Sequence, residues 1–344
     1  MIKTRIKAGH RRLITRAPIA SRLLVALFIL VCTAELWIGG HPILLVYQGQ
    51  WFSPLAGPVI AGTTLGQSQT WEADYRALST EWSQSGADHW MWMPLIPWGP
   101  QEIDLGPGRE ALQPPALARH HFLGTDQVGR DVLARLIYGL RIALFFALAL
   151  TIASYVIAII IALLSATGPR WLDTLIQRAI EIWSHLPFLY VVIGASVFVR
   201  ASGIYLLMIM IIFSWSSLST YLRAALLREK NCDYYRAAEL LGLPRWRLWT
   251  AHLLPQLSPI LFTFVPYTFA GAITSLTILD YLGFGLPPHL PSWGELLDEG
   301  LRQPQAYWLV WPVTLGLISL LTLASAIGEA SRKELLPSQT REFR

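Results

Sequence analysis

Six long apolar stretches limit what this chain can fold into. Each approaches the roughly 20 residues that a helix needs to cross about 30 Å of hydrocarbon. Only 14% of the 344 residues are charged and 53% are hydrophobic, whereas a soluble chain carries about 25% charged residues. The sequence therefore predicts an all-α membrane protein with six transmembrane helices. The stretches run approximately from Leu23 to Ile38, Ile142 to Leu164, Ala179 to Val199, Ile204 to Leu222, Ile260 to Leu279 and Tyr307 to Ile327.

The placement of Lys and Arg predicts how these helices are oriented. Most of the 27 basic residues lie in the N-terminal segment, in the connections after the second and fourth stretches, and at the C-terminal end. Short loops rich in Lys and Arg stay on the cytoplasmic side, so we expect both termini to be cytoplasmic. A cleaved signal peptide is the alternative for the first stretch. No small-x-small cleavage site follows it, and we interpret it as an uncleaved anchor.

These assignments divide the chain into five segments. The long segment after the first helix is rich in Trp, Pro and Gly, and we expect a mostly irregular periplasmic insert there. Two interpretations of the insert remain open: a structural cap, or a docking surface for an external delivery protein or a partner subunit. The segments are a basic cytoplasmic N terminus (1–22), the first transmembrane helix (23–41), the insert (42–140), a core of five helices with a cytoplasmic loop at 223–256 (141–335), and a cytoplasmic tail (336–344).

The cytoplasmic loop contains a short helix whose two ends are both marked in the sequence. Asn231 is a suitable N-cap, Gly242 suits the position after the last turn, and Pro244 prevents continuation. A solitary helix of about ten residues is marginal in water, so some other surface must hold it.

The middle of this helix indicates what such a surface would contact. Ala237 and Ala238 have small side chains that let a neighbour approach the backbone, while Tyr234 and Leu241 share one face as apolar anchors. This pattern is typical of a helix lying in a groove of another protein. A connector packed on its own protein is the alternative.

These residues also match a known family. Ala237, Ala238, Gly242 and the later Leu254-Pro255 resemble the "EAA" cytoplasmic loop of the inner-membrane permeases of binding-protein-dependent ABC importers. Further motifs are His121-Phe-Leu-Gly-Thr-Asp126 with Gly129-Arg130-Asp131, Glu181-Ile-Trp-Ser-His-Leu-Pro187, Leu282-Gly-Phe-Gly285 and Pro291-Ser-Trp-Gly-Glu-Leu-Leu297. They resemble motifs of the dipeptide/oligopeptide branch of this family, in its C-type subunit. The N-terminal part, with Cys32, Glu35, Leu44-Leu45-Val46 and the Trp-rich insert, looks more like the YejE-type permeases of microcin C and peptide uptake systems.

The resemblance implies a permease subunit, located in the bacterial inner membrane, of an ATP-driven importer of peptides or peptide-like compounds. It implies as partners a second homologous permease, two ATPase domains or one fused double ATPase, and a periplasmic solute-binding protein. ATP and Mg would be bound by the ATPases, since this chain has no G-x-x-x-x-G-K-[ST] phosphate loop; no cofactor, metal site, catalytic residue or nucleic-acid partner is expected here. The residues implied to couple to the ATPase are Tyr234, Arg236, Ala237, Ala238, Leu241 and Gly242. Arg236 replaces the acid usual in the family, so its partner charge should be negative.

Hydroxyl side chains in the fourth and fifth apolar stretches are candidates for a substrate pathway. They would hydrogen-bond peptide groups in a wet cavity, or alternatively their own helix carbonyls. The candidates are Ser214, Ser217, Thr220, Thr274, Ser275 and Thr277.

Two other classes of function compete with the permease. An ion-coupled secondary transporter of small solutes needs intramembrane acids with partners, and the chain offers Glu35 and little else. An intramembrane hydrolase needs a nucleophile with a base or a metal pair, and neither H-E-x-x-H nor G-x-S-x-G occurs.

Overall fold

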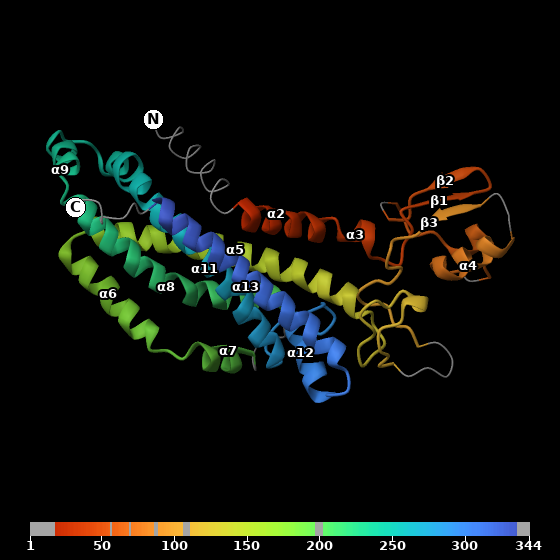
Figure 1. Cartoon of the computed structure of the whole chain (residues 1–344). Helices are drawn as coiled ribbons and strands as arrows, with labels where there is room; N and C mark the ends of the chain where they lie inside the picture. Colours follow the sequence, from red (N-terminus) through yellow and green to blue (C-terminus); the bar gives the residue numbers. More distant parts are fainter. Residues whose placement is uncertain are drawn as a thin grey trace, which may run out of the picture. The chain divides into compact units, whose positions relative to one another are not determined.

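A computed structural model describes residues 18–55, 57–68, 70–85, 89–105, 111–196 and 202–335, and they are mostly helical (Figure 1). The predicted tail at 336–344 and most of the basic N terminus lie outside these residues. The chain divides into two compact units: a core unit of residues 1–25, 143–287 and 316–344, and an insert unit of residues 26–142 and 288–315.

Among the described residues, four helical segments are long and apolar enough to cross a membrane. They are α5 (Val132–Thr167), α8 (Gly203–Lys230), the continuous run Arg245–Tyr281, and α13 (Tyr307–Leu335) over its residues Tyr307–Arg332. The second, fourth, fifth and sixth predicted stretches lie inside these segments. Each helix continues beyond its apolar stretch into more polar sequence.

The first and third stretches are not single helices. The first is divided into α2 (Pro18–Cys32) and α3 (Ala34–Trp37). The third is divided into α6 (Arg170–Ser184) and α7 (Phe188–Ser196). Pro187 explains the second break, because it lacks a backbone N–H and disfavours helical geometry in the residue before it.

The expectation of an all-α chain with an irregular insert was wrong in one part. A three-stranded antiparallel sheet of order β2-β1-β3 is formed by β1 (Leu44–Tyr47), β2 (Gln50–Phe52) and β3 (Trp90–Trp92). One sheet face packs near α4 (Tyr75–Ser85) in a small hydrophobic core (Figure 1). The hairpin turn uses Gln48 and Gly49, both with positive φ, which fits the right-handed twist of paired strands. Gln-Gly is a weak turn signal.

The motif from His121 onward forms a buried ion network in the insert unit. We call it the Arg135 cluster: Asp126, Arg130, Arg135, Glu295 and Glu299. Both Arg130 and Arg135 pair with Asp126, and Arg135 also bonds Glu295 at 2.6 Å and Glu299 at 3.2 Å. The two glutamates belong to α12 (Trp293–Arg302), whose Ser292 side chain caps the first turn. The cluster therefore fastens α12 to the first turns of α5.

Candidate functional site

The predicted short helix is α9 (Asp233–Leu240), and it begins one residue later than expected. Asn231 is not its N-cap, because α8 continues to Lys230 and Asn231 closes that helix in αR geometry. Cys232 is the N-cap, and its thiol makes no capping hydrogen bond.

The C-terminal end of α9 agrees with the prediction. Gly242 has φ +74°. This left-handed backbone conformation costs conformational free energy in residues other than Gly. Its N–H donates to the Glu239 carbonyl (3.0 Å), and the Leu243 N–H donates to the Ala238 carbonyl (3.4 Å). This is a Schellman motif, which satisfies carbonyls that the helix end leaves open.

One face of α9 is anchored in its own protein. Tyr235 and Ala238 are 3% and 5% exposed and join a hydrophobic cluster with Ala166 of α5, Leu226 of α8 and Leu253. Burial raises the pKa of Tyr235. The two alanines of the predicted coupling set therefore differ: Ala237 is exposed, whereas Ala238 is buried against its own chain, as the alternative interpretation expects for a packed connector.

In the part of the chain that the structure describes, the opposite face of α9 is exposed. Leu240 and Leu241 are 89% and 81% exposed, and Arg236 and Ala237 are exposed beside them. Leu240 was missed by the sequence analysis. Its position opposite Tyr235 and Ala238 on a helical wheel becomes informative only once the buried face is known.

Tyr234 is not a free apolar anchor. Its hydroxyl donates to Glu229 Oε2 at 2.7 Å, and its ring stacks on His252 with centroids 6.2 Å apart. Burial, with the Glu229 carboxylate, raises the pKa of Tyr234. The hydrogen bond and the stacking therefore hold Tyr234 on its own chain.

A short irregular passage joins α9 to the next apolar helix. It consists of α10 (Arg245–Arg247) and the π-helix η3 (Leu248–Leu253), followed by α11 (Leu254–Tyr281). Pro255 lies in the first turn of α11 and cannot donate to the carbonyl of Ala251, so the wider π turn precedes it. Leu248 and Leu253 pack in the same hydrophobic cluster as α9. A displacement of α9 can therefore be transmitted to α11 through these packed side chains.

The six pathway hydroxyls are not gathered in one place. Four of them donate to their own helix at the carbonyl four residues back, which fits the alternative interpretation. These bonds are Ser214 to Met210, Thr220 to Ser216, Thr274 to Ala270 and Thr277 to Ile273.

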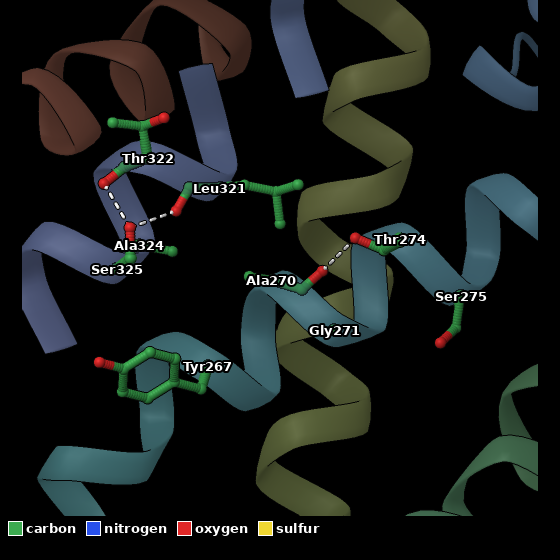
Figure 2. A pocket seen from close by; sticks show the side chains of 9 residues that line it. All are labelled: Tyr267, Ala270, Gly271, Thr274, Ser275, Leu321, Thr322, Ala324 and Ser325. Carbon is green, nitrogen blue, oxygen red and sulfur yellow. Dashed lines mark hydrogen bonds between the residues drawn. The ribbon is translucent and has the colours of Figure 1, made fainter. Parts of the chain in front are cut away.

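Two of the six hydroxyls line a hollow in the core unit. Figure 2 shows Thr274 and Ser275 on α11 with Thr322 and Ser325 on α13 around this space of about 650 Å³. Thr277 is 5% exposed and does not line it. Ser214, Ser217 and Thr220 lie on α8 and are not among its lining residues either.

Comparisons with known proteins match the part of the chain that contains this loop to a family. Residues 154–335 match the model of the binding-protein-dependent transport system inner membrane component. The chain is 37% identical over 320 residues to the inner membrane ABC transporter permease protein YejE of Escherichia coli, covering 92% of each chain. It is 34% identical over 343 residues to the peptidoglycan transport system permease protein YejE of Agrobacterium fabrum, covering 92% and 88%. A provisionally named peptide transport system permease protein of Brucella suis is 33% identical over 235 residues, covering 67% and 77%.

Proposed function

Because the chain belongs to the family of inner membrane components of binding-protein-dependent transport systems, we propose that it is the permease subunit of an ATP-driven importer of peptides or peptide-like compounds. It is a multi-pass protein of the inner membrane and a transport component, not an enzyme. The family implies ATPase and solute-binding partners. We further propose six crossings with both termini cytoplasmic, a periplasmic insert, a second homologous permease, and two ATPase domains.

The outward face of α9 carries this proposal. Burying a Leu side chain contributes about 1.5–3 kcal/mol, and Leu240 and Leu241 forgo most of that in the isolated chain. The inner face of α9 is already held, so a partner that covers the outer face does not have to order the helix first. An ATPase groove is the expected partner, since the chain has no phosphate loop of its own.

The transport step follows from the way α9 is seated. When the ATPases close on ATP, they push α9, and Tyr235 and Ala238 transmit that movement to the cluster shared with α5, α8 and α11. The helices then move as rigid bodies between inward- and outward-facing states. In this mechanism the chain converts motion and performs no covalent chemistry.

The hollow between α11 and α13 supports a cargo with peptide groups. There Thr274 can accept from a peptide N–H while its own proton stays on the Ala270 carbonyl, and Ser275 can donate or accept. The name of the Agrobacterium relative favours a second candidate, fragments of peptidoglycan, which also carry peptide groups. Competition for uptake between a radiolabelled tripeptide and unlabelled peptidoglycan fragments separates the two: strong inhibition by the fragments at low concentration favours the second.

The coupling proposal is tested with Leu240→Asp. We expect this variant to lose co-purification with the ATPase subunits and ATP-driven uptake, because a carboxylate would enter an apolar contact. Leu117→Asp is the matched control, since Leu117 is 75% exposed and lies outside the loop. Normal uptake by Leu240→Asp would overturn the proposal. Ala238→Glu is unsuitable, because it would bury a charge within the chain itself.

A further inference from the structure

The sheet in the insert unit has a face made of tryptophans. Val46 in the central strand lies opposite both Trp51 and Trp90, and Leu44 lies opposite Trp92. Directly paired residues, and residues two apart on a strand, point to the same face of a sheet. We call these five residues the Trp face.

The two faces of this sheet differ in burial. Leu45 is fully buried, and Phe52 and Met91, its partners on the neighbouring strands, pack against the same core. On the Trp face, by contrast, Trp51, Trp92 and Trp90 are 72%, 58% and 52% exposed. Among the described residues of the insert unit, one sheet face therefore packs in the core, while the three tryptophans of the other face stay largely exposed.

The chemistry of the Trp face fits the surface of a bilayer. All five of its residues are uncharged. Trp combines a large apolar ring with one N–H donor, and it is enriched where membrane and water meet.

The chain connections hold the Trp face near the end of a membrane-crossing helix. Ile96 follows Trp92 by four residues, which span at most about 14 Å. Ile96 is buried in a cluster with Ile38 and with Ala134 in the first turn of α5. The 36-residue helix α5 is about 54 Å long, longer than the roughly 30 Å hydrocarbon core, so this end leaves the bilayer close to the sheet.

The residues just before the sheet also lie beside the first turns of α5. The carbonyl of Trp37 accepts from the Ile96 N–H at 3.0 Å, and the Tyr138 hydroxyl of α5 donates to the Ile38 carbonyl at 3.1 Å. Trp37 itself is 51% exposed at the end of the first apolar stretch. Exposed Trp at the end of an apolar helix is the arrangement of an interfacial anchor.

We propose that Trp51, Trp90 and Trp92 rest in the headgroup layer of the membrane, so that the insert is held against the lipid surface. The contact fixes the insert beside the outer end of α5. It does not depend on which cargo is carried or on the ATPase contact of α9.

The test uses the full chain in nanodiscs of phosphatidylethanolamine and phosphatidylglycerol. Spin labels are placed at Trp51→Cys and, separately, Trp90→Cys in a Cys32→Ala, Cys232→Ser background. Glu81→Cys, at an exposed position of α4, is the control. Collision with lipid-soluble oxygen is compared with collision with a water-soluble nickel chelate.

We expect the oxygen-to-nickel ratio to be severalfold higher at both Trp positions than at Glu81. Equal ratios at all three positions would overturn the proposal. So would labels that are wet in nanodiscs and become shielded only when the solute-binding protein is added, because the Trp face would then be a protein-docking surface. Since no transport is measured, this result is separate from failure of the proposed coupling.

Discussion

The loop around α9 and the Arg135 cluster both carry motifs of the same family, yet their side chains are used in opposite ways. At the end of α9, Leu240 and the C-cap residue Leu241 are 89% and 81% exposed. In the Arg135 cluster, Asp126 and Arg135 are fully buried and are paired with each other. Burial therefore indicates whether a family motif serves the fold or a partner.

The physical cost differs in the two regions. Buried charges are tolerated in the Arg135 cluster because each is held by an opposite charge. The exposed leucines at the end of α9 are not buried within the chain. The free energy of burying them can therefore still stabilise a contact with another protein. Substitutions in the cluster should act on folding, whereas substitutions on the outer face of α9 should act on assembly.

Arg135→Ala should give the largest effect. It leaves Asp126, Glu295 and Glu299 facing Arg130 alone, and removing one partner of a buried ion pair costs about 3–5 kcal/mol. We expect a marked loss of folded protein and of thermal stability in detergent. Arg302→Ala is the control, because its side chain is 73% exposed and pairs with Asp298 within α12; it should cost about 0.3–0.5 kcal/mol. Equal melting temperatures for the two variants would contradict the claim that the Arg135 cluster stabilises the fold.

Gly242→Ala should come next. Among the described residues, no neighbouring atom lies within 4 Å of a Cβ added at Gly242, so the cost comes from φ +74° alone, about 1–2 kcal/mol. Gly194→Ala also has open space but no positive φ, and it should be neutral or stabilising by about 0.5–1 kcal/mol. Thermal unfolding of the two variants checks the difference. If Gly242→Ala is as stable as Gly194→Ala, the Schellman ending of α9 is not required.

Cys232→Ser should strengthen α9. A Ser hydroxyl at the N-cap can accept from a backbone N–H of the first turn, which the Cys232 thiol does not do; such caps contribute about 0.5–2 kcal/mol. The expected result is slower amide exchange in α9 by mass spectrometry, with the Arg135 cluster unchanged as the internal control. Faster exchange in α9 would contradict this assignment of the cap.

Glu299→Gln should give the smallest effect, and it depends on pH. Burial, and next the nearby Asp126, raise the pKa of Glu299 above its ordinary value of 4.5. The ionised carboxylate is therefore less favourable in the folded chain than in the unfolded one. That cost is fully present above the folded pKa, shrinks as the pH falls through it, and vanishes below 4.5.

The Gln variant removes this cost but keeps one oxygen to accept from Arg135. It should be slightly more stable than the wild type at pH 7.5, with the gain lost as the pH is lowered towards 4.5. Melting temperatures across this range measure the trend. If the stability gained by Glu299→Gln increased as the pH was lowered, the proposed direction of the pKa shift would be wrong.

The sequence predicted the apolar helices best, because hydropathy over 20 residues reports directly on membrane crossing. It placed the start of α8 within one residue. It missed the division of the third stretch, although Pro187 was visible, since apolar composition concealed the break. The sheet was missed because strands of three or four residues and a Gln-Gly turn give almost no local signal.

The site was predicted in part for a similar reason. Gly242 and Pro244 act through local backbone geometry, which can be predicted from the residue type alone. Which face of α9 is buried depends instead on helices α5, α8 and α11, which are distant in sequence. The choice between Tyr234 and Tyr235, or between Ala237 and Ala238, therefore required the structure.

The most direct test of the central claim is the accessibility of Leu240→Cys in a Cys32→Ala, Cys232→Ser background. Its rate of reaction with a maleimide is measured in membranes that contain the ATPase subunits and in membranes stripped of them, with Leu117→Cys as the control. If the outer face of α9 docks in an ATPase groove, the subunits should slow labelling strongly at position 240 and leave it unchanged at 117. Equal rates at position 240 in both preparations would contradict the claim.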